Sequence, residues 1–283
     1  MFRIASVGVL VLAASASAQV TVYSNGGGSG DNVVGPSPIV PVGSSGWYYN
    51  NVRVGSTAGI QTTLPRSGNG SAYFTGTNGS SKGDIEFYNI VGGQLAPMGT
   101  LSSLSSMSYD WFRSSTSSVA DHLHISYRLL YDADGDMSTT TDRGALVFER
   151  IYNGGAAAPT DAWQSDDVFN WNGVGQSANV WMTNTGNPNG SIEEVYGRTI
   201  QDWLNSPNPN AAYPSLNNGA VIYGLSLGFG SGWNGTFAGA VDNVTIGFGG
   251  NSVTYNFEVV PAPGAAALAG LGGIAALRRR RRR

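Results

Sequence analysis

Short segments in which apolar and polar residues alternate follow one another along most of this chain, separated by clusters of Gly, Asn and Ser. In the clearest segment, residues 122–131, every second residue is apolar: Leu123, Ile125, Tyr127, Leu129 and Tyr131. A period of two places these side chains on one face of a β-strand. Ala145–Tyr152 has strand character too, and the polar loop between the two segments predicts a hairpin.

Further strands are expected wherever the same pattern returns: Trp47–Val54, Ser71–Phe74, Asp84–Tyr88, Met107–Arg113, Val221–Gly228, Thr236–Phe248 (in one or two pieces) and Val253–Phe257. The Gly and Asn residues between them tolerate the positive φ of tight turns. With only 12% charged residues and 41 glycines, the chain is not a coiled coil, and without cysteine it is not a disulfide-stapled domain.

The stretch from Gln19 to Glu258 has no internal repeat and no linker, so one domain is expected. Many short strands with frequent turns predict an all-β fold, an antiparallel two-sheet sandwich. One short helix is expected in addition. Ser191 and Glu194 have the spacing of a capping box, apolar residues then recur at helical spacing, and Pro207 ends the pattern. Glu193 and Glu194 are adjacent and point about 100° apart, which favours a helix start over a catalytic pair.

Three segments near the end of this domain carry a resemblance: residues 230–237 (GSGWNGTF), 240–246 (AVDNVTI) and 255–258 (YNFE). Together with Trp47-Tyr48 and residues 70–74 (GSAYF), they resemble secreted bacterial domains of the jelly-roll or concanavalin-like type. The resemblance implies the same two-sheet sandwich and leaves the function open.

The N-terminus has the three parts of a secretory signal peptide. Arg3 is followed by the apolar run 4–14 and by the small-residue triplet Ala16-Ser17-Ala18. A short buried helix is the alternative. We expect export, with cleavage between Ala18 and Gln19.

At the C-terminus, Val259-Val260-Pro261-Ala262-Pro263 precedes an apolar run, residues 264–277, and six arginines, residues 278–283. Fourteen residues are fewer than the roughly 20 that a membrane-spanning helix needs. Arginines directly after the run, Arg278, Arg279 and Arg280 first among them, are typical of a cytoplasmic stop. The segment is therefore expected to enter the membrane transiently.

This arrangement resembles the PEP-CTERM sorting signal of exported bacterial proteins, with Pro261 and Pro263 matching its prolines and Ala262 standing where the family has Glu. The resemblance implies processing by an exosortase-type membrane transpeptidase. A plain tail anchor is the alternative, and both place the protein at the cell surface or outside the cell. The chain then divides into a signal peptide (1–18), a β-sandwich (19–258) and a sorting signal with its arginine stop (259–283).

Asp132, Asp134 and Asp136 alternate in the loop of the predicted hairpin. Carboxylates at this spacing converge on one point and suit a structural Ca²⁺ ion. Met137 and Arg143 replace the Gly and Glu of an EF-hand, so an acidic surface turn is the alternative.

Catalytic chemistry finds little support. The chain has no cysteine and no Gly-x-Ser-x-Gly motif, and His122 and His124 are its only histidines. Their i, i+2 spacing could share a metal, although solvent-facing polar side chains on a strand are the simpler interpretation. A glycosidase needs two carboxylates across a groove, and no local pattern pairs the candidates, which are Asp84, Glu86, Asp110 and Glu149. We therefore expect no enzyme.

The 7 Trp and 13 Tyr residues raise the option of carbohydrate binding. All 18 acidic residues lie between Asp31 and Glu258, whereas Arg3 and the six terminal arginines lie outside the body, which leaves it a net charge of about −10. Nucleic acid is thereby disfavoured as a partner. We expect an exported surface or extracellular-matrix protein with a structural or adhesive role. The alternatives are a carbohydrate-binding module, with extracellular polysaccharide as partner, and a polysaccharide-active enzyme.

Overall fold

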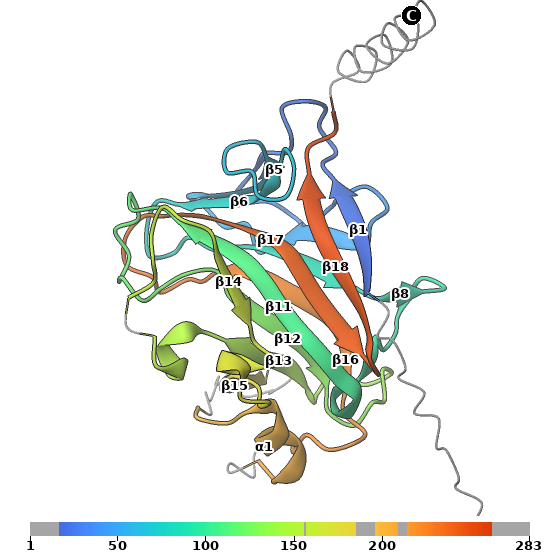
Figure 1. Cartoon of the computed structure of the whole chain (residues 1–283). Coiled ribbons are helices and arrows are strands. Elements are labelled where there is room, and N and C mark those ends of the chain that lie inside the picture. Colours follow the sequence, from blue (N-terminus) through green and yellow to red (C-terminus); the bar gives the residue numbers. More distant parts are fainter. Residues whose placement is uncertain (1–16, 156, 185–195, 209–213, 262–283) are drawn as a thin grey trace, which may run out of the picture.

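The computed structural model describes residues 17–155, 157–184, 196–208 and 214–261. In these residues two β-sheets pack face to face (Figure 1), and the predicted two-sheet sandwich with one short helix is confirmed. The first sheet contains β1 (Ser17–Tyr23), β2 (Val33–Val34), β5 (Ser56–Gln61), β6 (Ser71–Gly76), β11 (Leu104–Arg113), β14 (Gln164–Asp167), β17 (Phe237–Phe248) and β18 (Asn251–Glu258).

The second sheet has the order β15-β13-β12-β16-β7-β4-β3. Its strands are β15 (Val180–Asn184), β13 (Arg143–Phe148), β12 (Ser126–Asp132), β16 (Val221–Phe229), β7 (Gly83–Tyr88), β4 (Trp47–Asn50) and β3 (Val40–Pro41), and β10 (Gly99–Thr100) also pairs with β16. The expected hairpin is β12–β13. All pairs in both sheets are antiparallel except β1 with β18, which is parallel.

Smaller elements lie outside the two sheets. The β8 (Ile90–Val91) and β9 (Gln94–Leu95) hairpin projects from the body (Figure 1). The helix α1 (Ile200–Asn205) lies beside β15, where Trp203 Nε1 donates to the carbonyl oxygen of Val180 at 2.9 Å.

Aromatic and branched side chains from the inner faces of both sheets form one core. Ile125, Tyr127, Leu129 and Tyr131 are fully buried, as the alternation predicts. Trp47 of the second sheet packs edge-on against Phe257 of the first, with ring centroids 5.0 Å apart. These contacts leave the outer face of the second sheet free for polar residues.

Several local predictions were wrong. The predicted strands Trp47–Val54 and Ala145–Tyr152 end at Asn50 and Phe148, and Arg150–Asn153 forms a 3-10 helix. The predicted strand 122–131 begins only at Ser126, and His124 is buried (2% exposed) instead of facing solvent. Residues 196–198 are not helical. The helix begins after Thr199, whose side chain accepts from Asp202 N in a capping box of its own. Ser191 and Glu194 lie outside the described residues. The predicted segment Thr236–Phe248 forms one strand, β17.

The predicted terminal signals are only partly covered by the described residues. Ala18 and Gln19 are exposed in β1, Pro261 is exposed, and Val259 is buried in the core. Pro263 and Arg278, Arg279 and Arg280 lie outside the described residues. In the part of the chain that the structure describes, no helix is long and apolar enough to cross a membrane.

Candidate functional site

A groove of about 520 Å³ runs over the outer face of the second sheet. Residues from six adjacent strands form one row across this face, in the order Trp181, Val147, Arg128, Ser226, Glu86 and Tyr48. The five inter-strand steps span roughly 24 Å. A parallel row contains Ser126, Gly228, Asp84 and Asn50. The groove is lined by the part of these rows from Trp181 to Glu86 and by Ser126 and Asp84, while Tyr48 and Asn50 on β4 lie beyond its lining.

Asp84 is the most buried charged group in the groove, with 1% of the residue exposed. Arg128 Nη1 donates to its Oδ1 at 2.9 Å, and Lys82 Nζ lies 3.3 Å from its Oδ2. Asn51 Nδ2 donates to Oδ2 at 3.0 Å. A Cβ at Gly228 would clash with this carboxylate, so the glycine makes room for it.

Glu86 follows Asp84 by two residues on β7. Because successive side chains of a strand alternate between its two faces, Glu86 projects from the same face of the sheet as Asp84. It is 5% exposed and accepts from Asn50 Nδ2 at 2.6 Å and from the hydroxyl of Tyr88. Burial raises the pKa of Glu86, and the charge of Asp84 raises it further. Glu86 therefore favours the neutral acid at a pH where an ordinary glutamate is ionised.

Glu149, directly after β13, lines the other end of the groove. Trp181 Nε1 donates to its Oε2 at 3.3 Å, and Ser126 Oγ donates to its Oε1 at 3.2 Å. Tyr196 stands beside this group, with its ring centroid 4.6 Å from that of Tyr152 and 5.9 Å from that of Trp181. Tyr152 and Tyr196 are 38% and 41% exposed, so the aromatic cluster (Tyr152, Trp181, Tyr196) offers ring surface to a ligand.

The four carboxylates that the sequence offers as glycosidase candidates do not share a site. Asp84, Glu86 and Glu149 line the groove, whereas Asp110 lies on β11 of the other sheet. There Asp110 is bonded to Arg66, Ser165 and Asn243.

The two histidines do not form a metal pair. His124 stacks on Trp111, with ring centroids 4.4 Å apart, and its burial lowers the pKa of the imidazole to about 3. Its Nδ1 lies 2.8 Å from the carbonyl oxygen of Ile125, and its Nε2 accepts from the backbone N–H of Arg150 at 3.2 Å. His122 instead lies at the rim of the groove.

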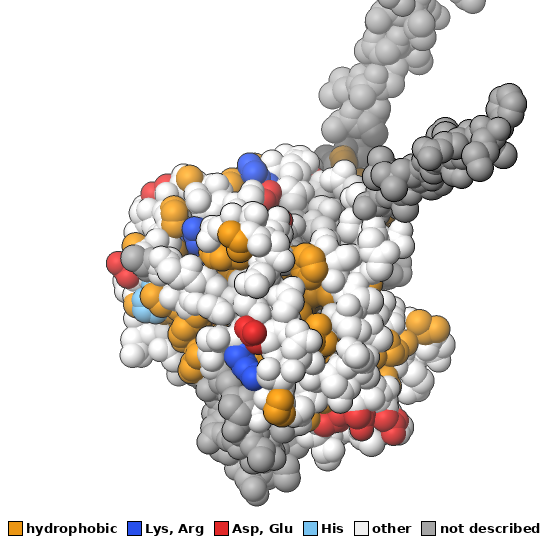
Figure 2. Space-filling view, turned by 60° about the horizontal axis from the view of Figure 1, so that its bottom comes forward, with side chains coloured by type: hydrophobic (Ala, Val, Ile, Leu, Met, Phe, Trp, Pro, Cys, Tyr) orange, Lys and Arg blue, Asp and Glu red, His pale blue; other side chains and the backbone are white. Residues whose placement is uncertain are grey.

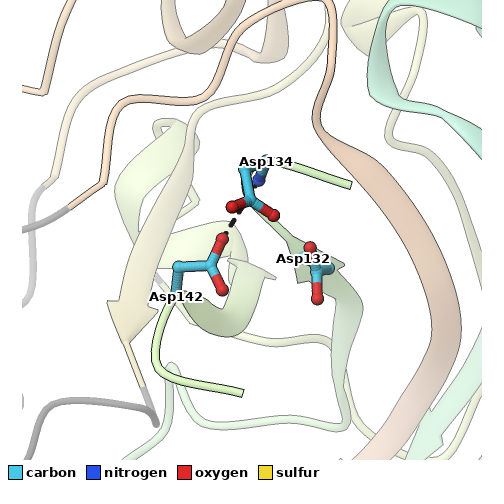
Figure 3. A group of neighbouring side chains, drawn as sticks. All are labelled: Asp132, Asp134 and Asp142. Carbon is cyan, nitrogen blue, oxygen red and sulfur yellow. Dashed lines mark hydrogen bonds between the residues drawn. The ribbon is translucent and has the colours of Figure 1, made fainter. Parts of the chain in front are cut away.

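The acidic loop brings together a different trio from the predicted one (Figure 3). Carboxylate oxygens of Asp132, Asp134 and Asp142 lie within 4.8 Å of one another. Asp136 is outside this group, because its Oδ1 accepts from the backbone N–H and the hydroxyl of Ser138. Alternation along the loop suggested Asp136, but the chain turns back at this point and brings Asp142 to the other two.

Hydrogen bonds and one ion pair hold this loop together. Asp142 Oδ2 accepts from the backbone N–H of Asp134 at 3.0 Å, the contact drawn in Figure 3. Asp132 Oδ2 lies 3.1 Å from Arg143 Nε, and its Oδ1 accepts from Gly135 N. Oxygen ligands at this spacing fit a hard cation. Asp132 would share its charge between that cation and Arg143.

The surface around these features carries few charges. On the face shown in Figure 2, charged side chains stand apart in small groups among uncharged ones. The groove itself is lined by five charged residues, Lys82, Asp84, Glu86, Arg128 and Glu149, among hydroxyl, amide, aromatic and aliphatic side chains.

No protein-family model matches the sequence, and no curated protein matches it. Among solved structures, the chain is similar to the native family 12 xyloglucanase from Bacillus licheniformis, with 13% identity and a TM-score of 0.41, over 77% of this chain and 100% of that chain. It is also similar to the family 11 carbohydrate-binding module from Clostridium thermocellum in complex with a β-1,3-1,4-mixed-linked tetrasaccharide, with 9% identity and a TM-score of 0.35, over 82% and 98%.

Proposed function

We propose that the protein binds a polysaccharide chain in the groove of the second sheet. The observation that carries this proposal is the row of residues from Trp181 to Tyr48 on the outer face of the sheet, with an aromatic ring at each end and Arg128, Ser226 and Glu86 on the largely buried floor between them. Sugar rings present flat apolar faces and a rim of hydroxyls, and the groove offers a complement to both. Its volume lies in the usual range of ligand sites.

The proposed binding does not include cleavage. Asp84 and Glu86 lie on the same strand about 7 Å apart along it, so they would meet a bound chain from one side. Hydrolysis of a glycosidic bond needs two carboxylates that flank it. The charge of Asp84 is also taken up by Lys82 and Arg128. Incubation with soluble polysaccharides and assay of reducing ends tests this point, and release of oligosaccharides above the level of a protein-free blank would contradict it.

We further propose that the protein is exported and acts at the cell surface or in the extracellular matrix, in a structural or adhesive role. The N-terminal segment with Ala16-Ser17-Ala18 and the Pro261–Arg283 segment support this placement. An exosortase-type enzyme would then process the C-terminus. Intact-mass analysis of protein recovered from producing cells tests both steps. We expect a chain that begins at Gln19 and has lost the arginines, and recovery of the unprocessed chain would contradict the proposal.

The experiment for the binding itself is retention of the purified protein on immobilised or soluble polysaccharides. We expect retardation by at least one glycan, and reduced retardation for a Trp181→Ala variant of unchanged melting temperature. Absence of retention on every glycan offered, including the polysaccharide of the producing cells, would contradict the proposed function.

A further inference from the structure

We infer that two copies of this chain associate through β1: the strand of one copy pairs antiparallel with the same strand of the other and joins their first sheets into one. This association is independent of the glycan binding proposed above. β1 forms an outer edge of the first sheet (Figure 1), and it differs from the other edge strands that the structure describes.

Those other edge strands are protected in one of three ways. β2, β3 and β10 have only two residues each. β14 carries Asp166 and Asp167. The outer side of β15 is covered, since Val180 N donates to the carbonyl oxygen of Arg198 at 2.8 Å and Trp203 Nε1 donates to that of Val180. Short length, charge and cover are the means by which proteins keep sheet edges from pairing with other molecules.

β1 has none of these protections. It is seven residues long, carries no charged residue and pairs with β18 alone, and only Val22 among its residues is buried. Because the backbone N–H and C=O groups of a strand point alternately to its two sides, those directed away from β18 have no partner among the described residues. Cleavage after Ala18 would leave this edge in place from Gln19 to Tyr23.

Apolar surface lies beside the same edge. Val20 and Tyr23 are 41% and 49% exposed. Val20 is paired with Tyr255 of β18, which lines an apolar hollow of about 340 Å³ together with Phe87 and Phe248. Stable interfaces bury roughly 1,200 Å² or more in total, so a partner needs such surface beside the strand pair itself.

The distribution of charge favours a second copy at this place. The body has a net charge of about −10, so two copies repel each other over most approaches at low ionic strength. No charged side chain belongs to β1 or lines the hollow, and two copies can meet there without bringing like charges together. A second copy also covers its own unprotected edge in the same step, because a two-fold contact uses the same surface of both molecules. The groove lies on the second sheet and stays open in both copies.

Sedimentation velocity of the purified protein over a wide range of concentrations tests the association. We expect monomers that pass into dimers and no further, because a two-fold contact closes at two copies. Val20→Lys brings two cations together at the shared edge and should weaken dimerisation about tenfold. Val54→Lys is the matched control, since Val54 is 63% exposed and precedes β5, at the other end of the first sheet, and it should dimerise like the parent. A parent that stays monomeric, assemblies larger than a dimer, or equal dimerisation of the two variants would overturn the inference.

A cysteine placed on the shared strand gives a second measurement, because the chain has no cysteine of its own. Pairing of Gln19–Tyr23 with its copy places Thr21 opposite Thr21, and opposed residues of antiparallel strands have Cβ atoms about 5 Å apart. Thr21→Cys should therefore form disulfide-linked dimers under mild oxidation, much faster than Val54→Cys. Cross-linking of Thr21→Cys that is no faster than that of Val54→Cys would overturn the pairing through β1, and unchanged melting temperatures show that the variants are folded.

Discussion

The guanidinium of Arg128 on β12 reaches over β16 and donates to Asp84 Oδ1 on β7 at 2.9 Å. On the way, Nη1 also donates to Ser226 Oγ of β16 at 3.2 Å. One side chain thus links three neighbouring strands across the floor of the groove. The same contact compensates the buried charge of Asp84, so stability and the electrostatics of the groove depend on it together.

Replacement of Arg128 by Met is expected to lower the free energy of unfolding by about 2 kcal/mol, because Asp84 remains buried with Lys82 as its one cationic partner. Urea unfolding at pH 7 measures the change. Arg53→Met removes the same charge at an exposed position and is expected to cost less than about 0.5 kcal/mol. If the two variants lose the same free energy of unfolding, the Arg128–Asp84 contact contributes no more to stability than an exposed arginine does.

The aromatic cluster is expected to supply much of the glycan affinity. Tyr196→Ala should weaken binding about tenfold, because an exposed ring that stacks on a sugar is lost while little buried surface changes. Calorimetric titration with a soluble polysaccharide that retains the parent protein measures the effect. Tyr23→Ala, an equally exposed tyrosine on β1, is the control and should leave the affinity unchanged. A Tyr196→Ala variant that binds like the parent would place the ligand elsewhere.

The contribution of Asp242 to stability is expected to fall as the pH rises from 4 to 7. The contribution of His124, whose pKa burial lowers to about 3, rises over part of the same window. Asp242 on β17 is fully buried, and its burial raises the pKa from 3.8 to about 7. The folded state therefore holds this proton more tightly than the unfolded state, so the contribution to stability is full below pH 4 and lost as the pH passes 7. For one such group, a rise of one pH unit within this window lowers the free energy of unfolding by at most about 1.4 kcal/mol. Glu86 and Asp166 are shifted in the same direction.

Asp242→Asn isolates this contribution. The amide oxygen can still accept from Phe257 N, as Asp242 Oδ1 does at 2.8 Å, but the side chain no longer titrates. Denaturant unfolding at intervals from pH 4 to pH 7 should show that the stability of the variant falls less, or rises more, with increasing pH than that of the parent. Identical slopes would mean that Asp242 keeps an ordinary pKa.

The calcium hypothesis for the acidic loop now concerns Asp132, Asp134 and Asp142. If this trio binds the ion, millimolar Ca²⁺ should raise the melting temperature of the parent and leave that of Asp142→Asn unchanged, since binding to the folded state alone is stabilising. Asp136→Asn should respond like the parent. A melting temperature that chelator and Ca²⁺ leave unaltered would remove the hypothesis.

The sequence located most of the long strands, because alternation with a period of two is a local signal. It placed Ile125, Tyr127, Leu129 and Tyr131 toward the core, where all four are buried. It missed the true start of β12, since the chain before Ser126 does not continue the strand and His124 turns in to stack on Trp111. Alternation says nothing about where a strand begins.

The groove itself could not be predicted. Arg128 and Glu149 meet Asp84 and Glu86 only through the order β13-β12-β16-β7, in which neighbours in space are distant in sequence. Sheet order and register depend on the packing of the whole core and have no local signature. The helix shows the same limit, because two segments have capping spacing and the one at Thr199 and Asp202 forms the described helix.

A glycan is proposed to lie along the row from Trp181 to Tyr48. The measurement that tests this placement is a titration of the purified protein with oligosaccharides of increasing length, prepared from a polysaccharide that retains the protein and repeated with Trp181→Ala. Because the row spans roughly 24 Å, the affinity should rise with each added sugar until the row is filled and should then stay constant. The Trp181→Ala variant should lose affinity chiefly for the long oligosaccharides. No binding at any length, or affinity that is independent of length and of Trp181, would contradict the account.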